Sequence, residues 1–289
     1  MKKFWNSLKT RFKVYKKRPL SLVLFLAVIL SAVVTFSVLI YLIGYILVMG
    51  IPNISWDLFA WEYNSENNSL MPALINTITM TFLSLLIAVP FGIFSAIYLT
   101  EYAKRGNKIV GLVRITAETL SGIPSIVYGL FGMLFFVTAL HWQLSLLSGA
   151  FTLAIMILPL IMRTTEEALK SVPDSYREGS FGLGAGRLRT VFRIVLPAAV
   201  PGILAGVILA IGRIVGETAA LIYTAGTVAK IPDLMSSGRT LAVHMYVLSN
   251  EGLHTDKAYA TAVVLLVIVI LINALSAFAA KKLSKGTRV

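Results

Sequence analysis

The amino-acid sequence predicts an all-α integral membrane protein with six transmembrane helices. Of its 289 residues, 57% are hydrophobic and only 13% are charged, which is more apolar sequence than a soluble domain of this size needs. The apolar residues are gathered into runs of about twenty, the length that a helix needs to cross a hydrocarbon layer roughly 30 Å thick. The basic residues are confined to alternate connecting segments, which is typical of a chain that crosses a membrane repeatedly.

Each apolar run is interpreted as one span. The first is retained rather than cleaved as a signal peptide, because the apolar stretch after the basic start is too long for a signal sequence and lacks a small-residue cleavage site. The predicted spans are about 20–48, 75–100, 120–140, 146–162, 198–222 and 258–280.

The placement of charge predicts the orientation of the chain. Twenty-two of the 26 Lys and Arg residues lie in the N-terminal tail, the 101–119 and 163–197 loops and the C-terminal tail. Basic residues collect on the cytoplasmic side, so both termini are predicted to be cytoplasmic. The same asymmetry accounts for the net charge of +13 without a nucleic-acid partner. The chain has no cysteine, which excludes disulfides and thiolate metal sites.

The segment between the first two spans carries aromatic residues on the predicted outer side. Trp and Tyr are enriched where a membrane meets water, so an interfacial belt is the favoured interpretation. A docking surface for an external partner is the alternative. The residues concerned are Trp56, Phe59, Trp61 and Tyr63.

The loop before the fifth span predicts a two-helix element on the cytoplasmic face. Ser175-x-x-Glu178 has the spacing of a capping box that opens a first helix. Gly182, Gly184 and Gly186 then permit a sharp turn.

The second helix of this element has one apolar stripe. Leu188, Val191, Phe192 and Val195 follow the i, i+3, i+4, i+7 spacing of a helix face, and Pro197 is expected to close the helix. Such an element can dock a soluble partner and transmit its movement to the next span. A peripheral amphipathic loop that rests on the membrane is the alternative.

Two charges lie inside the fifth span, where charge is costly and usually marks function. Arg213 and Glu217 are spaced i, i+4 and can neutralise each other as an ion pair that locks the bundle. The functional interpretation is that the planar guanidinium of Arg213 binds a tetrahedral oxyanion. Glu217 would then hold Arg213 in place or accept a hydrogen bond from a protonated anion.

Polar residues on other spans are weaker candidates. Thr77 and Thr81 form part of a polar stripe on the second span that could face a solute pathway, although hydroxyls on membrane helices are commonly satisfied by backbone carbonyls. Arg163 ends the fourth span and is either a positive-inside anchor or a contact at the exit of the pathway.

Small residues on the fifth span predict close helix packing. Gly202, Gly206 and Ala210 recur every four residues, as do Gly212 and Gly216, and this spacing allows another helix to approach closely.

The 174–197 element resembles the EAA loop of ABC importer permeases, whose consensus is Glu-Ala-Ala, x3, Gly, x9, Ile-x-Leu-Pro. The spacing agrees throughout, but the two alanines are replaced by Gly and Ser. The resemblance implies a coupling helix that inserts into a groove of a separate ATPase subunit. No Gly-x4-Gly-Lys-Ser/Thr occurs in the sequence, so the chain is expected not to hydrolyse ATP itself. The residues that match the motif are Glu178, Gly179, Ser180, Gly184, Ile194, Leu196 and Pro197.

A wider resemblance covers most of the chain from the second span onward. Residues 118–129, 163–169, 212–219 and 241–246 are similar to phosphate ABC importer permeases of the PstA type. The resemblance implies a type I permease core and places Arg163, Arg213 and Glu217 at charged positions associated with phosphate passage. The alternatives are a permease for another oxyanion or small solute, such as sulfate or molybdate, and an ion-coupled carrier that works alone.

The resemblance also implies the partners and the location. The expected partners are an ATP-binding subunit in two copies, a sister permease of the PstC type that completes a heterodimeric pore, and an extracytoplasmic phosphate-binding protein. The chain is expected in the bacterial inner membrane, surrounded by lipid, with no cofactor or metal. The expected domains are a basic tail (1–18), the first span (19–50), an outer segment (51–74), the transmembrane core (75–280) and a second basic tail (281–289).

Overall fold

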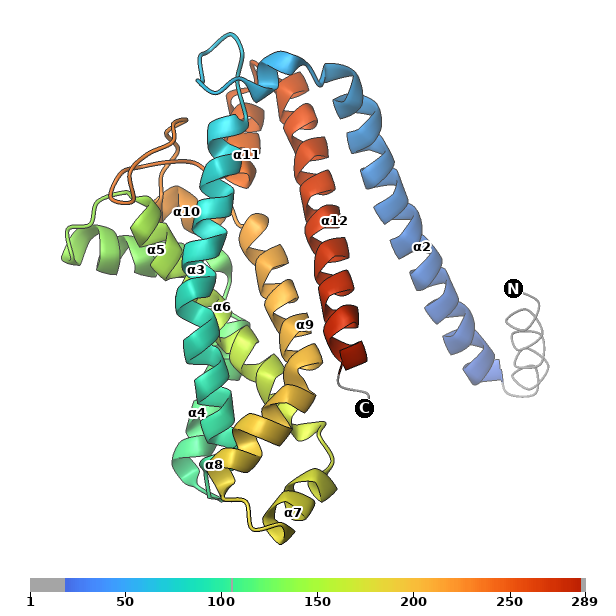
Figure 1. Cartoon of the computed structure of the whole chain (residues 1–289). Helices are drawn as coiled ribbons and strands as arrows, with labels where there is room; N and C mark the ends of the chain where they lie inside the picture. The colour runs from blue at the N-terminus through green and yellow to red at the C-terminus, as the bar shows by residue number, and fades with distance from the viewer. Residues whose placement is uncertain (1–18, 105, 287–289) are drawn as a thin grey trace.

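A computed structural model of the chain describes residues 19–104 and 106–286, and every regular element within these ranges is helical (Figure 1). The predicted tail 1–18, Arg105 and the last three residues of the predicted tail 281–289 lie outside the described residues. Five helices are long and apolar enough to cross a membrane, and a bent pair raises the number to six if it counts as one span. The long helices are α2 (Pro19–Gly50), α3 (Met71–Ile97), α6 (Leu146–Lys170), α9 (Leu196–Val215) and α12 (Thr255–Gly286).

The predicted third span is not a straight helix. α4 (Lys108–Ser121) and α5 (Ser125–Gly132), with the π-helical turn Met133–Ala139, form a pair bent by 103°. The break falls at Gly122–Pro124, inside the predicted span 120–140. Pro124 is the N-cap of α5 and has extended ψ, and a proline disfavours helical geometry in the residue before it. The prediction of a continuous span was therefore wrong here.

The predicted fifth span differs at both ends. The helix ends at Val215 rather than running to residue 222, and a short helix, α10 (Ala219–Thr224), follows the break. At the other end, α8 (Arg187–Thr190), the π-helical turn Val191–Val195 and α9 form one continuous helix of 29 residues, Arg187–Val215. Pro197 was predicted to close a helix, but it lies inside this one, just after the π-helical turn. Such a local π adjustment lets a membrane helix accommodate a proline.

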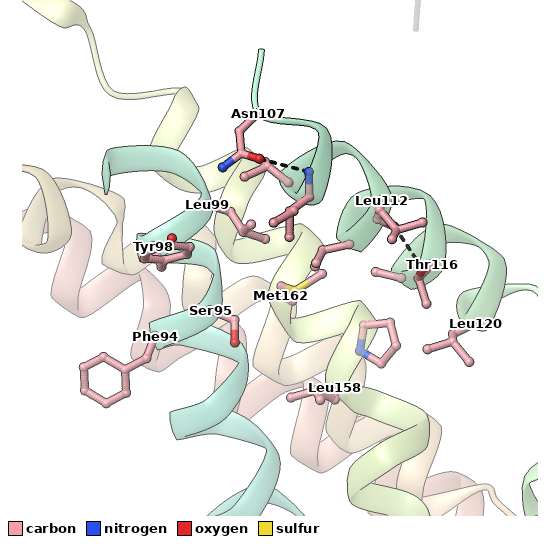
Figure 2. Close-up of a pocket in the computed structure, with 15 residues that line it drawn as sticks. Phe94, Ser95, Tyr98, Leu99, Asn107, Leu112, Thr116, Leu120, Leu158 and Met162 are labelled. Atoms are coloured by element: carbon pink, nitrogen blue, oxygen red, sulfur yellow. Dashed lines mark hydrogen bonds between the residues drawn. The ribbon is translucent and has the colours of Figure 1, made fainter. Parts of the chain in front are cut away.

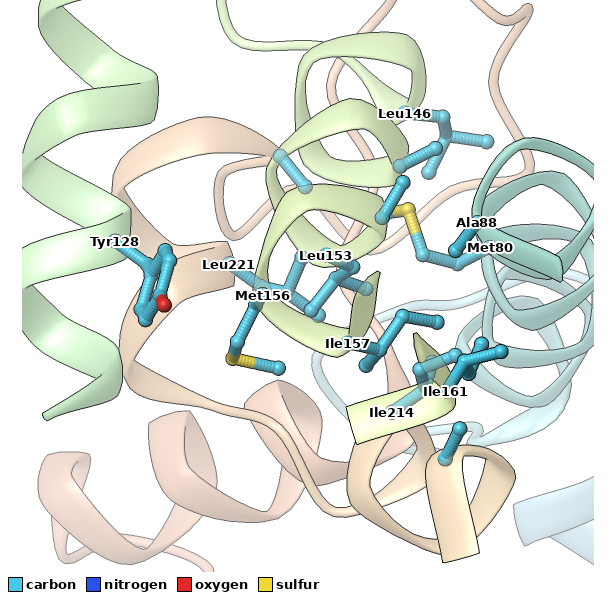
Figure 3. Packing of buried hydrophobic residues seen from close by; sticks show 14 of the residues in the cluster. Met80, Ala88, Tyr128, Leu146, Leu153, Met156, Ile157, Ile161, Ile214 and Leu221 are labelled. Carbon is cyan, nitrogen blue, oxygen red and sulfur yellow. The ribbon is translucent and has the colours of Figure 1, made fainter. Parts of the chain in front are cut away.

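The core of the bundle surrounds α6, which contacts α3 on one side and α9 on the other. Figure 3 shows Met80 of α3, Ile214 of α9 and Leu221 of α10 directed toward the buried residues of α6. Helices in lipid associate through such close packing rather than through the expulsion of water.

Two of the glycines predicted to allow close helix packing, Gly202 and Gly206, lie where α9 meets α6. A Cβ atom at Gly202 would lie 2.7 Å from the Ala168 Cβ, and one at Gly206 would overlap Thr164. Gly212 is different, because a Cβ there would meet no atom within 4 Å. The packing prediction is confirmed for Gly202 and Gly206 and was wrong for Gly212.

The first span lies at the side of the bundle. α2 packs against α12 near the end that carries residues 51–70 and diverges from it toward the other end (Figure 1). At the contact, a Cβ on Gly50 would lie 2.8 Å from the Tyr259 carbonyl carbon, so a larger residue does not fit.

The 51–70 segment closes one end of the bundle together with α11 (Leu241–Glu251). Trp56 and Trp61 are exposed there, as a belt at a membrane surface requires. The opposite end carries α7 (Asp174–Gly182), α8 and the start of α4, and is called the α7 end below.

Candidate functional site

Helix α7 presents apolar side chains to solvent at the α7 end. Tyr176, Phe181 and Leu183 are exposed, and Leu183, just past the helix, is 91% accessible. Glu178 and Gly179 are exposed on the same element. Apolar side chains exposed outside the membrane spans indicate a surface that another protein covers.

The predicted capping box is absent. Pro173 is the N-cap of α7 and no side chain caps the helix, so Ser175 and Glu178 lie within its first two turns. The predicted turn is confirmed at Gly184, whose φ of +81° lies in the left-handed region that favours glycine.

An ion pair holds α7 against the end of α3. Arg177 Nη2 donates to Glu101 Oε1 at 2.6 Å, and the side chains of Arg177 and Glu101 are 15% and 9% exposed. Arg177 also donates to the backbone carbonyls of Leu169 and Val172 at 2.9 and 2.8 Å. The hydrogen bond to Glu101 raises the pKa of Arg177 above its usual range, so its charge is permanent.

The residues that match the EAA motif have different environments. Ser180 is buried, and its hydroxyl lies 2.8 Å from the Thr190 hydroxyl, which joins α7 to α8. A Cβ atom at Gly179 would meet nothing within 4 Å. Ile194 and Leu196 are half-buried in the helix that continues into α9, and Pro197 is exposed. Small size is therefore required by the chain itself at Ser180 but not at Gly179.

Half of the predicted apolar stripe of this helix is buried. Val191 and Val195 are 1% and 0% exposed and pack into the core at the α7 end, whereas Leu188 and Phe192 are exposed.

Arg213 and Glu217 do not form the predicted ion pair. None of the ion pairs among the described residues includes either of them. The helix ends between them, at Val215, so the i, i+4 geometry is lost. Glu217 instead turns to the backbone, where its Oε1 accepts from the N–H groups of Thr218 and Ala220, both at 3.1 Å. The carboxylate thus accepts hydrogen bonds from backbone N–H groups at the start of α10, which have no partner within the helix.

Arg213 is consequently a cation at a helix break with no acidic partner in the described chain. Its side chain is half-buried. It acts electrostatically on the hydroxyl of Tyr128, a buried residue of α5 that donates to the Leu120 carbonyl at 2.8 Å. A guanidinium in this position can bind an anion without first giving up an internal partner.

Arg163 lies in a network of charges at the α7 end of α6. Its Nε is 3.2 Å from Glu167 Oε1, and its Nη1 is 3.8 Å from Glu118 Oε1. The neighbouring Glu166 receives Arg114 at 2.8 Å and Lys170 at 2.6 Å. The three cations and three acids balance one another, so the network does not present an excess of positive charge.

The two threonines of α3 are satisfied within the protein. Thr77 is buried, donates to the Ala73 carbonyl at 2.7 Å and accepts from the Leu241 N–H at 2.8 Å. Thr81 is half-buried and donates to the Thr77 carbonyl at 2.7 Å. These bonds give Thr77 a structural task at the start of α11, and a role for either residue in a pathway stays a prediction.

An apolar groove of about 760 Å³ runs between α3 and α4 (Figure 2). Its lining includes Ser95 of α3, Leu112 of α4 and Met162 of α6, and no charged side chain lines it. Its chemistry suits lipid and not an anion, so the candidate site for a charged solute is the break at Arg213.

Sequence comparison identifies the chain. Residues 88–289 match the family described as binding-protein-dependent transport system inner membrane component. The chain belongs to this family. Its members are permeases, so this chain is a multi-pass subunit of an inner-membrane transport system, and the family implies an ATPase and a solute-binding protein as partners.

Individual relatives agree with the family. A probable ABC transporter permease, YqgI of Bacillus subtilis, is 33% identical over 243 residues, which cover 78% of this chain and 82% of the relative. The phosphate transport system permease protein PstA of Pasteurella multocida is 34% identical over 237 residues, covering 78% and 81%. PstA 1 of Mycobacterium tuberculosis is 38% identical over 154 residues, which span 53% of this chain and 50% of that protein.

Solved permeases share the fold. A chain of a bacterial alginate ABC transporter in complex with a periplasmic protein superposes with a TM-score of 0.68 at 19% identity, covering 95% of this chain and 98% of the other. A chain of the inward-facing MetNI methionine ABC transporter gives 0.58 at 20% identity, covering 74% and 94%. The predicted fold, an all-α ABC importer permease, is confirmed.

Sequence reasoning missed several members of these clusters. Arg177 lies within the 174–197 element but was not predicted to have a role, and its partner Glu101 is 76 residues away. Arg114 was counted only among the basic residues of the 101–119 loop, and Glu166 lay only within the 163–169 stretch that is similar to phosphate permeases. The available signal was the position of Arg177 directly before the motif glutamate; for the other three residues the spacing gave none.

Proposed function

We propose that this chain is the phosphate-conducting permease subunit of an ATP-driven importer. The observation that carries the proposal is Arg213, an unpaired and half-buried cation at the end of a continuous helix whose other end adjoins α7. The relatives named phosphate permeases support the choice of solute.

The first step is the docking of an ATPase subunit on α7. The exposed Tyr176, Phe181 and Leu183 supply an apolar surface, and Glu178 and Gly179 lie on the same exposed element. Burial of such side chains contributes roughly 25 cal/mol per Å² of apolar surface. ATP-driven closure of the ATPase would displace α7.

The displacement then travels by two routes. Through Arg177 and Glu101 it reaches the end of α3. Through Ser180 and Thr190 it reaches the helix Arg187–Val215, which at 1.5 Å per residue is roughly 43 Å long. A continuous helix can move as one rigid body, so a displacement at Arg187 would also displace Arg213. Movement of this helix would open the pathway alternately to the outside and to the inside.

At the break, Arg213 compensates the charge of the anion in transit. The planar guanidinium can donate two parallel hydrogen bonds to a tetrahedral oxyanion. Glu217 Oε1 is engaged with the start of α10, and its Oε2 makes no hydrogen bond within the described residues. Oε2 can accept a hydrogen bond from a protonated oxyanion, which would favour phosphate over fully deprotonated sulfate.

The remaining predicted residues take secondary roles. Arg163, held by Glu167 and Glu118, would contact the anion at the cytoplasmic exit. Thr77 and Thr81 would line α3 beside the pathway while keeping their backbone hydrogen bonds.

The proposed assembly contains a sister permease of the PstC type, two copies of the ATPase and an external phosphate-binding protein. Both termini are proposed to be cytoplasmic, because the basic loops meet at the α7 end. The core domain 75–280, the first span 19–50 and the outer segment 51–74 remain the proposed divisions of the chain.

Reconstitution tests the function directly. The complete transporter in liposomes, with the binding protein outside and ATP on the ATPase side, is expected to accumulate labelled phosphate. Uptake of sulfate or molybdate in place of phosphate would favour the other oxyanion permeases. Phosphate uptake by this chain without the ATPase would instead identify an ion-coupled carrier and reject the proposal.

A further inference from the structure

Three polar residues are buried together where α11 begins, at the 51–70 end of the bundle. Arg239 is 4% exposed, Thr240 is 2% exposed and His244 is fully buried. This end is the extracytoplasmic one in the proposed orientation. Arg213 belongs to a different element, the last turn of α9.

Several polar atoms of this cluster have no hydrogen-bond partner. The unpaired atoms are Nε and Nη2 of Arg239 and the hydroxyl of Thr240, whereas the imidazole of His244 lies against the backbone of Asn68. A buried polar group without a partner costs free energy, and a buried cation costs more. Several unpaired donors on neighbouring residues therefore indicate that an acceptor belongs among them.

The described part of the chain supplies no carboxylate for Arg239. None of the ion pairs among the described residues includes Arg239. Glu62, Glu66 and Asp233 lie on segments near it in sequence or space, and all three are exposed. The missing acceptor must come from outside the chain.

The orientation of the guanidinium leaves one edge for a ligand. Its face lies over the ring of Tyr63, with the central carbon 4.7 Å from the ring centroid. Tyr63 is held in turn by its hydroxyl, which donates to Asn68 Oδ1 at 3.1 Å. Nε and Nη2 form one edge of the fork, and this is an edge that binds two oxygens of an oxyanion or a single halide.

The N-terminus of α11 adds positive electrostatic potential next to Arg239. Thr240 is the N-cap, but its side chain does not cap the helix, although threonine commonly does so. Leu241 N–H is bound by Thr77. The positive end of an eleven-residue helix favours an anion, and the unpaired guanidinium edge is the independent observation that points to one.

We infer that Arg239, Thr240 and the first turn of α11 form a binding site for one small inorganic anion beneath the turn that carries Tyr63. The anion accepts from Nε and Nη2 of Arg239 and from the Thr240 hydroxyl. His244 adds no charge to the site, because burial and the nearby Arg239 lower its pKa to about 3. The site is independent of which solute the permease carries.

A reporter at Tyr63 tests the site locally. The complete transporter would be prepared in lipid nanodiscs with 3-fluorotyrosine at position 63. Sodium chloride and sodium phosphate would be titrated separately against gluconate at constant ionic strength, and the fluorine chemical shift followed. At least one anion is expected to give a saturable shift. Saturation with phosphate alone identifies an oxyanion site, and saturation with chloride identifies a halide site.

Variants assign the effect to the cluster. Arg239→Gln is expected to abolish the saturable shift. Lys230→Gln, which removes an exposed cation of the same loop, and Arg213→Gln are expected to retain it. A flat or linear response to both anions in the unmodified chain, as an enclosed water cluster would give, overturns the inference. So does a saturable shift that survives in Arg239→Gln. If Arg239→Gln does not assemble, Arg239→Lys, which keeps the charge but not the fork, is expected to weaken binding at least tenfold.

Discussion

Arg177 on α7 and Glu101 at the end of α3 are joined by a nearly buried ion pair, with Nη2 and Oε1 2.6 Å apart. Because of this pair, a displacement of α7 would move α3 as well as α9. Removal of one partner leaves the other charge unpaired in a desolvated place, which typically costs about 3 kcal/mol.

Arg177→Met is therefore expected to uncouple ATP hydrolysis from transport. We expect at least a tenfold fall in phosphate uptake per ATP hydrolysed, because α7 loses its ion pair with Glu101 and its hydrogen bonds to two backbone carbonyls. The measurement is uptake and ATPase activity on the same proteoliposomes.

Arg189→Gln is the matched control, since Arg189 is an exposed cation on the adjacent helix α8 and should leave the ratio unchanged. The exchange Glu101→Arg with Arg177→Glu should recover part of the coupling. A ratio that stays normal in Arg177→Met would show that α3 takes no part in transmission.

Gly179 and Ser180 are neighbours in the motif, but a leucine at each position should have a different effect. At Gly179 it should weaken ATPase binding, and at Ser180 it should lower the stability of the subunit. A leucine at Gly179 enters open space, so the fold should be unaffected while the partner surface is obstructed. We expect Gly179→Leu to keep the thermal midpoint of the isolated subunit and to weaken ATPase binding at least tenfold. Pull-down of the ATPase and thermal unfolding of the subunit are the two measurements.

Ser180→Leu is the matched comparison. It removes the hydrogen bond to Thr190 and overpacks a site that is 4% exposed, and each change typically costs about 1–3 kcal/mol. Its midpoint should fall. Equal loss of stability in both variants would contradict the view that Gly179 faces a partner rather than the chain.

Arg213 and Glu217 should affect transport differently. Arg213→Gln removes the charge proposed to compensate the anion at the helix break, so phosphate uptake is expected to fall at least a hundredfold. Arg213→Lys keeps the charge as a point rather than a fork and should retain a small fraction of the activity. Initial rates at several phosphate concentrations separate the effect on KM from that on kcat.

Glu217→Gln keeps an acceptor oxygen for the start of α10 but loses the negative charge. It is expected to preserve assembly and to reduce the preference for phosphate over sulfate. An unchanged selectivity would count against a contact between Glu217 and a protonated anion, while leaving the role of Arg213 standing.

The sequence predicted what depends on apolar length and charge, and failed where backbone breaks and distant pairs decide the structure. The spans followed from runs of apolar residues, but the breaks at Gly122–Pro124 and after Val215 lie inside the predicted spans, and the mean hydropathy of a span does not reveal a break within it. The i, i+4 spacing of Arg213 and Glu217 implied an ion pair only because a continuous helix was assumed.

Contacts between distant residues could not be predicted from spacing. Glu101 and Arg177 lie on different elements of the chain, as do Tyr63 and Arg239. Each pair depends on how helices and loops meet, which a single sequence does not specify. The motif around Ser180 did predict a two-helix element, but only the structure distinguishes a buried serine from a glycine that faces open space.

His244 makes the stability of the protein dependent on pH. It is fully buried beside Arg239, and Tyr63 packs edge-on at 6.2 Å. Its pKa is lowered to about 3, whereas in an unfolded chain it is about 6.5. Between these values the unfolded state binds the proton and the folded state does not, so stability rises with pH in this window and is lost as pH falls below about 6.5.

Acidification from pH 7.5 to pH 5 is therefore expected to cost about 2 kcal/mol through this one group. The measurement is chemical unfolding of the solubilised transporter as a function of pH.

His244→Gln should remove this part of the pH dependence of stability, because a glutamine amide does not titrate. His141→Gln, which replaces an exposed histidine, should leave it in place. If His244→Gln and the unmodified chain lose stability equally on acidification, the buried imidazole is not the titrating group. A bound anion beside Arg239 would favour the protonated imidazole and raise its folded-state pKa, so saturating anion should make the loss of stability on acidification smaller.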